Sequence, residues 1–103
     1  MLYLLQVRIP IEAGNAALCD PDFGKKMHAL LAKIKAKSAY FTTVDGQRGG
    51  YIVVSMKDAS EMPAIAEPFF LRLKADVTFL PVMTPNDLAK AGPAIGAAVR
   101  RWG

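Results

Sequence analysis

The sequence predicts one α+β domain, in which a four-stranded antiparallel sheet carries two helices on one face. Strand-like runs alternate with segments of helical spacing in the order β-α-β-β-α-β. The chain has 103 residues, a usual size for a single domain. Hydrophobic residues make up 52% of the chain and charged residues 21%, a composition that excludes intrinsic disorder. We expect the domain to span residues 1–83 and a C-terminal helical extension, packed on the domain or its partner, to span 84–103.

The first strand and the first helix follow from punctuation and spacing. Residues 2–9 form a leucine-rich and β-branched run that Pro10 ends. Residues 11–19 are expected to be irregular, because a Gly-Asn pair breaks the pattern. Asp20 is expected to cap a helix that has Pro21 at its first position. Apolar residues then recur at helical spacing and predict one buried stripe: Phe23, Met27, Leu30, Leu31 and Ile34.

The middle of the chain predicts a hairpin and a second helix. Residues 39–45 and 51–56 are strand-like and are separated by the glycine-rich segment 46–50, which predicts a longer hairpin loop. Ser60 is expected to cap the second helix. Pro68 is expected to end or sharply kink that helix, because proline lacks an N–H group and clashes with the preceding turn.

The last strand and the extension complete the pattern. Residues 76–82 read as a strand, and Thr84 with Asp87 three residues later predicts a helix start with a variant of the capping box. Gly92 and Pro93 are expected to interrupt the extension. Right-handed crossovers and a central hairpin turn this element order into the ferredoxin-like arrangement.

Alternation along each strand assigns side chains to two faces of the sheet. The face expected to pack under the helices collects Tyr3, Leu5, Val7, Ile9, Phe41, Val53, Val77 and Phe79. The other face is mixed but too apolar to leave in water, and it collects Leu2, Leu4, Gln6, Arg8, Tyr40, Thr42, Ile52, Val54, Met56, Thr78 and Leu80. Since two helices cover only one face, we expect a second copy to cover the other in a sheet-to-sheet homodimer.

Several segments resemble a known group of proteins. They are the opening Met1-Leu2-Tyr3 strand, the hairpin into residues 50–54, the segment 67–70, and the strand that ends at residues 80–82. In element order, length and spacing, residues 1–83 resemble the dimeric α/β-barrel superfamily, particularly its small muconolactone-isomerase-like members. The resemblance implies a ferredoxin-like fold that dimerises into an α/β barrel, and an isomerase-like activity if the protein is an enzyme. The superfamily also contains monooxygenases and many proteins of unknown role, so the fold does not choose the activity.

The mixed sheet face offers candidate ligand contacts. Apolar walls with a few convergent polar groups are the usual composition of a small-molecule site. The polar groups expected there are Gln6, Arg8, Tyr40, Thr42 and Thr78. Arg8 carries the only fixed charge among them and can clamp a carboxylate, so the sequence indicates a small apolar carboxylic acid as ligand. The alternative for Arg8 is an ion pair within or between subunits.

Two further side chains, His28 and Cys19, are of residue types that take part in catalysis. His28, the only histidine, is a candidate general acid or base, although a boundary side chain half in solvent is the favoured interpretation. Cys19 is interpreted as a small buried hydrophobic residue rather than as a nucleophile. One cysteine and one histidine leave no structural zinc site, and neither a metal nor a cofactor is expected.

The remaining function classes concern nucleic acids and membranes. Arg48 and Gly49 match the start of an RNA-recognition motif, but Gly50, Ile52 and Ser55 stand where that motif needs stacking rings. Nucleic acid is therefore an unfavoured partner, and an RNA-recognition-like module remains an alternative beside a structural or regulatory dimer without catalysis. The net charge of +4 is attributed to a solvated helix face. No apolar run approaches the ~20 residues of a membrane span, and no secretory signal is recognisable, so a cytoplasmic protein is expected.

Overall fold

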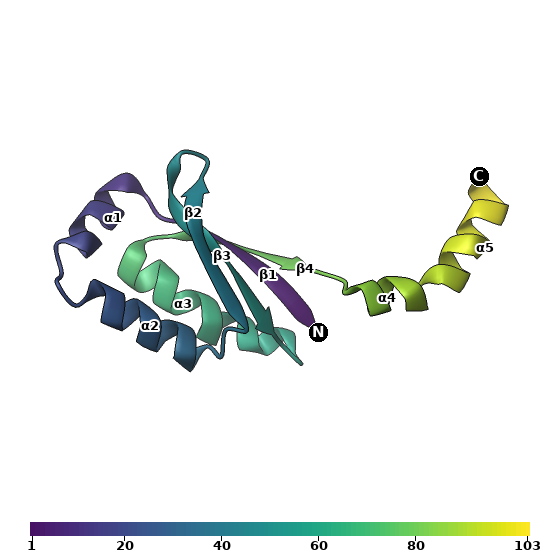
Figure 1. Ribbon diagram of the computed structural model, residues 1–103, viewed down its shortest axis with the longest axis horizontal. Coiled ribbons are helices and arrows are strands. Elements are labelled where there is room, and N and C mark those ends of the chain that lie inside the picture. The colour runs from purple at the N-terminus through teal and green to yellow at the C-terminus, as the bar shows by residue number, and fades with distance from the viewer.

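A four-stranded antiparallel sheet forms the centre of the domain, as predicted. A computed structural model describes residues 1–103. The strands are β1 (Leu2–Arg8), β2 (Ser38–Val44), β3 (Gln47–Ser55) and β4 (Asp76–Pro81). They pair in the spatial order β2-β3-β1-β4, so the two central strands are β3 and β1 (Figure 1). This order follows from the central hairpin and the two crossover connections.

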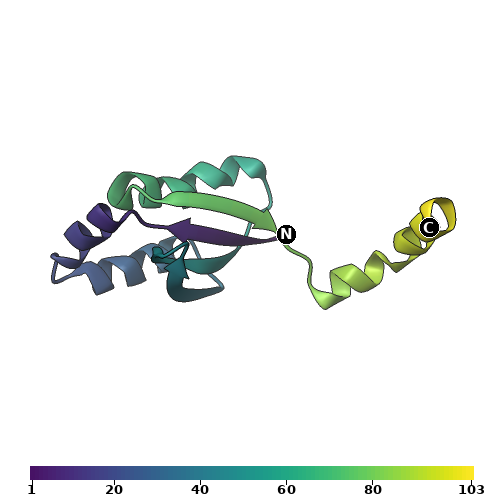
Figure 2. The same cartoon turned by 90° about the horizontal axis from the view of Figure 1, so that it is seen from above.

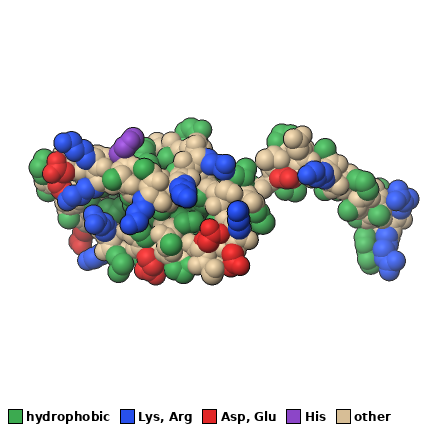
Figure 3. All heavy atoms as spheres, turned by 90° about the horizontal axis from the view of Figure 1, so that it is seen from below, with side chains coloured by type: hydrophobic (Ala, Val, Ile, Leu, Met, Phe, Trp, Pro, Cys, Tyr) green, Lys and Arg blue, Asp and Glu red, His purple; other side chains and the backbone are tan.

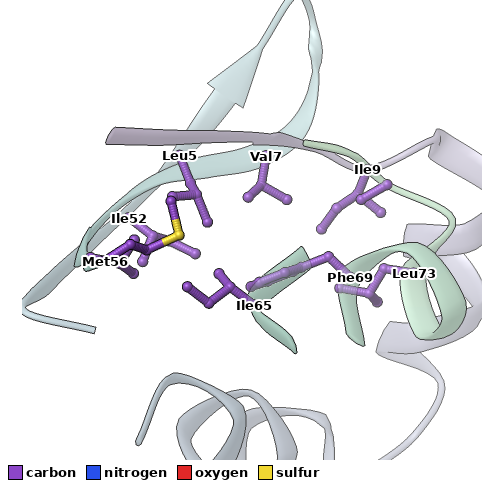
Figure 4. Close-up of a cluster of buried hydrophobic side chains, with 10 residues drawn as sticks. Leu5, Val7, Ile9, Ile52, Met56, Ile65, Phe69 and Leu73 are labelled. Carbon is purple, nitrogen blue, oxygen red and sulfur yellow. The ribbon is translucent and has the colours of Figure 1, made fainter. Parts of the chain in front are cut away.

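The helices fall into two groups. In the domain they are α1 (Ile11–Leu18), α2 (Phe23–Lys33) and α3 (Met62–Leu73), with a short 3-10 turn η1 (Ala59–Glu61) before α3. These three helices form a layer on one face of the sheet, here called the helix layer (Figures 1 and 4). In the extension they are α4 (Pro85–Lys90) and α5 (Gly92–Trp102), which project beyond the end of β4 (Figure 2).

The core lies between the sheet and the helix layer. Figure 4 shows side chains from β1 and β3 pointing toward those of α3. Leu5, Val54 and Phe69 are its most completely buried large side chains. Burying a side chain of this size stabilises the fold by about 1.5–3 kcal/mol. The rest of the cluster comprises Val7, Ile9, Ile52, Met56, Ile65, Leu73 and Ala75.

The prediction for the two faces of β3 was wrong. Tyr3 pairs with Val54 and Leu5 with Ile52 across the sheet, so Ile52 and Val54 belong to the core, and Met56 is buried with them. The reason is the hairpin: instead of a loop over 46–50, a two-residue turn at Asp45 and Gly46 joins the strands. A change of one residue in register moves every side chain of a strand to the other face.

The turn itself explains why the hairpin is so tight. Asp45 and Gly46 have φ values of 50° and 78°, and a two-residue turn that matches the twist of the strands needs positive φ at both positions. The turn therefore pairs Val44 with Gln47, and β3 begins at that residue rather than at residue 51. The face of the sheet without helices, called the open face below, consequently carries Leu2, Leu4, Gln6, Arg8, Tyr40, Thr42, Tyr51, Val53, Thr78 and Leu80.

Residues 11–19 were expected to be irregular, but they contain α1. Alanines at positions 13, 16 and 17 supply strong helix propensity, which outweighs the Gly-Asn pair. The start of the next helix also differs from the prediction, because α2 begins at Phe23. Asp20 does not cap it; its carboxylate accepts hydrogen bonds from the Asp22 N–H at 2.9 Å and from Lys26 Nζ at 2.6 Å.

Pro68 lies inside α3 and does not end it, which corrects the expectation that the helix would stop there. The helix continues through Pro68 to Leu73. Phe69 and Leu73, which follow the proline, are buried in the core, and this packing offsets the hydrogen bond that the proline lacks. The start differs as well: α3 follows η1, and the residue that caps η1 is Asp58, not Ser60, with Glu61 completing a capping box.

The start of the extension was predicted correctly. The Thr84 hydroxyl accepts a hydrogen bond from the Asp87 N–H at 3.1 Å, and the Asp87 carboxylate accepts one from the Thr84 N–H at 3.0 Å. This reciprocal pair fixes the first turn of α4. The chain then breaks at Ala91 and resumes as α5, so the interruption before Pro93 is short.

Candidate functional site

The polar side chains expected to contact a ligand lie on two adjacent rungs of the open face. On one rung, Gln6 is paired with Thr78 on β4 and with Tyr51 on β3, which is paired in turn with Tyr40. On the next rung, Arg8 is paired with Asp76 and with Gly49, and Gly49 is paired with Thr42. The structure therefore brings the predicted residues together on one half of this face.

Arg8 is neutralised within its own domain. Its Nε donates a hydrogen bond to Asp76 Oδ2 at 3.0 Å, and its Nη2 donates a second to the same oxygen. Asp45 Oδ2 lies 3.6 Å from Nη1. The hydrogen bond to Asp76, followed by the charges of Asp76 and Asp45, raises the pKa of Arg8. The structure thus shows an intra-subunit ion pair, which leaves Arg8 without a free charge for a ligand carboxylate.

The other half of the open face is apolar. One rung consists of Ser38, Val53, Leu4 and Leu80, and Leu2 follows on the neighbouring rung. Gly50 and Ile52, which occupy two of the positions where an RNA-recognition motif needs stacking rings, lie on the helix-covered face instead. That placement leaves the Arg48–Ser55 segment unable to present these positions to a base.

A cavity on the opposite side of the sheet provides a different candidate site. It has a volume of about 280 Å³ and lies between the sheet and the helix layer. Its walls come from β1 (Val7, Ile9), α1 (Gly14, Ala17, Leu18), α2 (Phe23, Met27), the hairpin (Phe41, Thr42, Arg48, Gly49, Gly50, Ile52) and α3 (Phe69, Leu73). Thr42 is the one predicted contact residue that borders it, and Arg48 supplies its only charge.

Arg48 is held at the cavity by contacts with α1 and with Ile9, the residue after β1. Its Nη1 donates a hydrogen bond to Asn15 Oδ1 at 2.9 Å, and its backbone carbonyl accepts one from the Ile9 N–H at 2.8 Å. Gly14 makes this approach possible, because a Cβ there would lie 2.9 Å from Arg48 Nη1. No carboxylate forms an ion pair with Arg48. Since a guanidinium has five N–H donors, most of its capacity is free to bind a planar anion.

Sequence reasoning missed this role of Arg48. The residue was placed in a hairpin loop, where its side chain has no defined direction. An Asp-Gly pair between strand-like runs is a strong signal for a two-residue hairpin turn, and it lies at residues 45 and 46. Reading that signal would have put Arg48 inside β3, on the same face as Gly50 and Ile52.

His28 and Cys19 lie outside both candidate sites. His28 is exposed on α2, and it is the purple side chain on the surface in Figure 3. Its neighbour Met27 borders the cavity, whereas His28 does not. Cys19 is exposed after the end of α1, so its interpretation as a buried hydrophobic residue was wrong. No group of three or more histidine, cysteine, aspartate or glutamate side chains is placed to hold a metal ion.

Comparisons with known proteins leave the family open. No protein-family model matches the chain, and a search of curated proteins finds no similar sequence. The likeness to muconolactone-isomerase-like proteins therefore remains an expectation from topology and punctuation. None of the helices combines the length and the hydropathy that crossing a bilayer requires.

Proposed function

We propose that the protein binds a small apolar carboxylic acid in the cavity between the sheet and the helix layer, with Arg48 holding the carboxylate. One observation carries this proposal: an arginine without an acidic partner lies at the wall of an otherwise apolar cavity. The cavity has a volume of about 280 Å³. It is larger than a cavity of about 150 Å³, which can bind benzene, and smaller than the pockets that hold drug-sized ligands. A ligand with one or two rings, or with a chain of medium length, fits this range.

The chemistry of the walls favours an acid over a neutral molecule. Apolar side chains form most of the cavity wall and suit the apolar part of such a ligand, while Arg48 lies at the exposed rim, where a carboxylate can stay near water. Arginine and carboxylate form two parallel charge-assisted hydrogen bonds, which are stronger than bonds between neutral groups. Asn15 keeps the guanidinium oriented before the ligand arrives, so less side-chain freedom is lost on binding.

The cavity supports binding rather than proton-transfer catalysis. General acid–base catalysis needs a titratable side chain within hydrogen-bond reach of the substrate. No carboxyl, imidazole, thiol or amine group lines the cavity, and His28 is exposed elsewhere on α2. The function we propose is therefore to carry, store or sense the acid. It does not include the isomerisation that the resemblance implies.

We further propose that the protein acts as a homodimer whose open faces meet, the assembly that the resemblance implies. The apolar half of the open face, formed by Leu2, Leu4, Val53 and Leu80, supports it, because a second sheet would remove these side chains from water. The cavity lies on the other side of the sheet and would stay accessible in such a dimer.

Calorimetric titration with a matched pair of probes tests the ligand proposal. 2-Naphthoate and 2-naphthamide have the same ring system and differ in charge. The wild-type chain is expected to bind the acid about 10- to 100-fold more tightly than the amide, which is the range of one charge-assisted hydrogen bond. Arg48→Gln is expected to remove this preference while retaining amide binding. An unchanged preference for the acid in Arg48→Gln would refute the proposal.

A further inference from the structure

Helix α5 presents an apolar stripe that its own domain leaves uncovered. Helices α4 and α5 project away from the sheet and the helix layer (Figures 1 and 2). Ile95, Val99 and Trp102 lie at positions i, i+4 and i+7 of α5, so their side chains share one side of the helix. They are 49%, 63% and 77% exposed. Such a stripe normally packs against another element.

The surface area of the chain exceeds that of a compact monomer by about the area that a dimer interface buries. The accessible surface of the chain is 7292 Å². A compact monomer of 11.1 kDa is expected to expose about 5,700 Å², so the excess is about 1,600 Å². The radius of gyration is 17.1 Å, against about 13 Å for a compact chain of this length. A standard interface buries about 800 Å² per partner and an obligate homodimer more, so the excess matches what a stable dimer needs.

The domain also has a partly apolar groove in its helix layer. It lies between α2 and α3, with a volume of about 890 Å³. Figure 3 shows this side of the domain, with apolar side chains exposed among charged ones of both signs. Its apolar lining includes Leu30, Pro63, Ala64 and Leu71, and Leu71 is 77% exposed. An amphipathic helix that inserts anchors at i, i+4 and i+7 into such a groove is a recurring mode of recognition. With 11 residues each, α5 and α2 have the same length.

We propose that α5 of one chain docks into the groove between α2 and α3 of a second copy of this chain, with Ile95, Val99 and Trp102 as anchors. The capping box at Thr84 and Asp87 fixes the first turn of α4. Both helices of the extension lead away from α2 and α3 of their own chain (Figures 1 and 2). In a two-fold dimer each copy places its tail in the groove of the other copy, so the stripes of both copies are covered. This inference goes beyond the proposed ligand site and beyond the proposed contact between open faces.

Cross-linking between two differently labelled chains tests the exchange directly. Cys19→Ser removes the native thiol from both chains; one chain then carries Val99→Cys and the other Leu71→Cys. Treating the mixture with a short bismaleimide is expected to give a covalent species of twice 11.1 kDa, because the tail of one copy lies in the groove of the other. Ala97→Cys replaces Val99→Cys as the control, since residue 97 lies on the opposite side of α5.

Two results would overturn the proposal. One is cross-linking of the mixture at no more than the level of the Ala97→Cys control. The other is a cross-link within a single chain when both cysteines are placed in it, because that would show the tail folded onto its own domain.

Sedimentation velocity on full-length variants provides the second measurement. Val99→Asp is expected to weaken the dimer at least 10-fold, and Ala97→Asp to leave it unchanged. Equal dimer affinity in the two variants would contradict the exchange. A wild-type protein that is monomeric and binds phosphatidylglycerol vesicles through the same stripe would also contradict it. Titration of both variants with 2-naphthoate reports on the ligand site separately, because the cross-link and the dimer affinity do not depend on that ligand.

Discussion

Arg8 and Asp76 face each other on neighbouring strands, and the Arg8 guanidinium donates two hydrogen bonds to one oxygen of the Asp76 carboxylate. Asp45 adds a second carboxylate at 3.6 Å. Arg48, the other arginine of the sheet, bonds to the neutral side chain of Asn15 instead. An anionic ligand is therefore expected at the cavity beside Arg48 and not on the open face beside Arg8.

Replacing Arg8 is expected to leave acid binding intact. In Arg8→Gln, the cavity and Arg48 are unchanged, so the affinity for 2-naphthoate should stay within about twofold of the wild-type value. Isothermal titration calorimetry measures it under the conditions used for Arg48→Gln. If Arg8→Gln loses the acid and Arg48→Gln retains it, the ligand binds on the open face.

Phe69 and Phe70 form a matched pair that tests the core. Phe69 is buried, whereas Phe70 is 40% exposed on the same helix. Phe69→Ala is expected to lower the free energy of unfolding by about 3–5 kcal/mol, because it removes buried surface and leaves a cavity. Phe70→Ala should cost much less. Urea unfolding monitored by circular dichroism measures both, and equal losses would show that α3 packs with a different face.

Two glycines are expected to respond in opposite directions to the same substitution. At Gly24 on α2 an added Cβ meets no atom within 4 Å, so Gly24→Ala should stabilise the protein by up to about 1 kcal/mol through helix propensity. At Gly50 on β3 the Cβ would lie 2.4 Å from the Tyr40 carbonyl oxygen, so Gly50→Ala must move a strand and destabilise the sheet. Thermal unfolding distinguishes the two. A stable Gly50→Ala protein would contradict the register of the β2–β3 hairpin.

The capping box before α3 predicts a loss of stability in acid. Backbone hydrogen bonds from Ser60 lower the pKa of Asp58, and those from Asp58 and Lys57 lower the pKa of Glu61. A lowered pKa means that the folded state prefers the charged form, so the stabilisation is complete above the unfolded-state pKa values and is lost as pH falls through the folded-state values.

Urea unfolding between pH 2 and pH 6 measures this effect. The urea concentration at the midpoint of wild-type unfolding is expected to decrease as the pH is lowered below about 4. Asp58→Asn combined with Glu61→Gln should make the midpoint less dependent on pH in that range. The variant keeps side chains of similar size, so packing is a minor difference. The same acid dependence in the variant would show that other carboxylates cause it.

Local patterns predicted β1, β4 and the capping box at Thr84, because each depends on residues close in sequence. The orientation of β3 could not be predicted in the same way. Ile52, Val53 and Val54 form a continuous apolar run, and such a run does not show which residues face the core. The register of the hairpin decides it, and that register depends on the turn at Asp45 and Gly46.

The same long-range relationships decided the candidate site. Arg8 was a reasonable ligand contact from its position on the strand, but its pairing with Asp76 depends on how β1 and β4 align 68 residues apart. Pro68 within α3 shows a similar override, since burial of Phe69 and Leu73 outweighs the local preference of proline. Arg48 gains its role only when α1, which the sequence pattern concealed, supplies Gly14 and Asn15.

The location of a bound acid tests the central claim most directly. Intermolecular nuclear Overhauser effects between 2-naphthoate and methyl-labelled protein report which side chains surround the ring. We predict contacts to the methyl groups of Met27 on α2 and Ile52 on β3, which both line the cavity. Contacts to Leu4 and Leu80 on the open face, without contacts to Met27 and Ile52, would contradict the account.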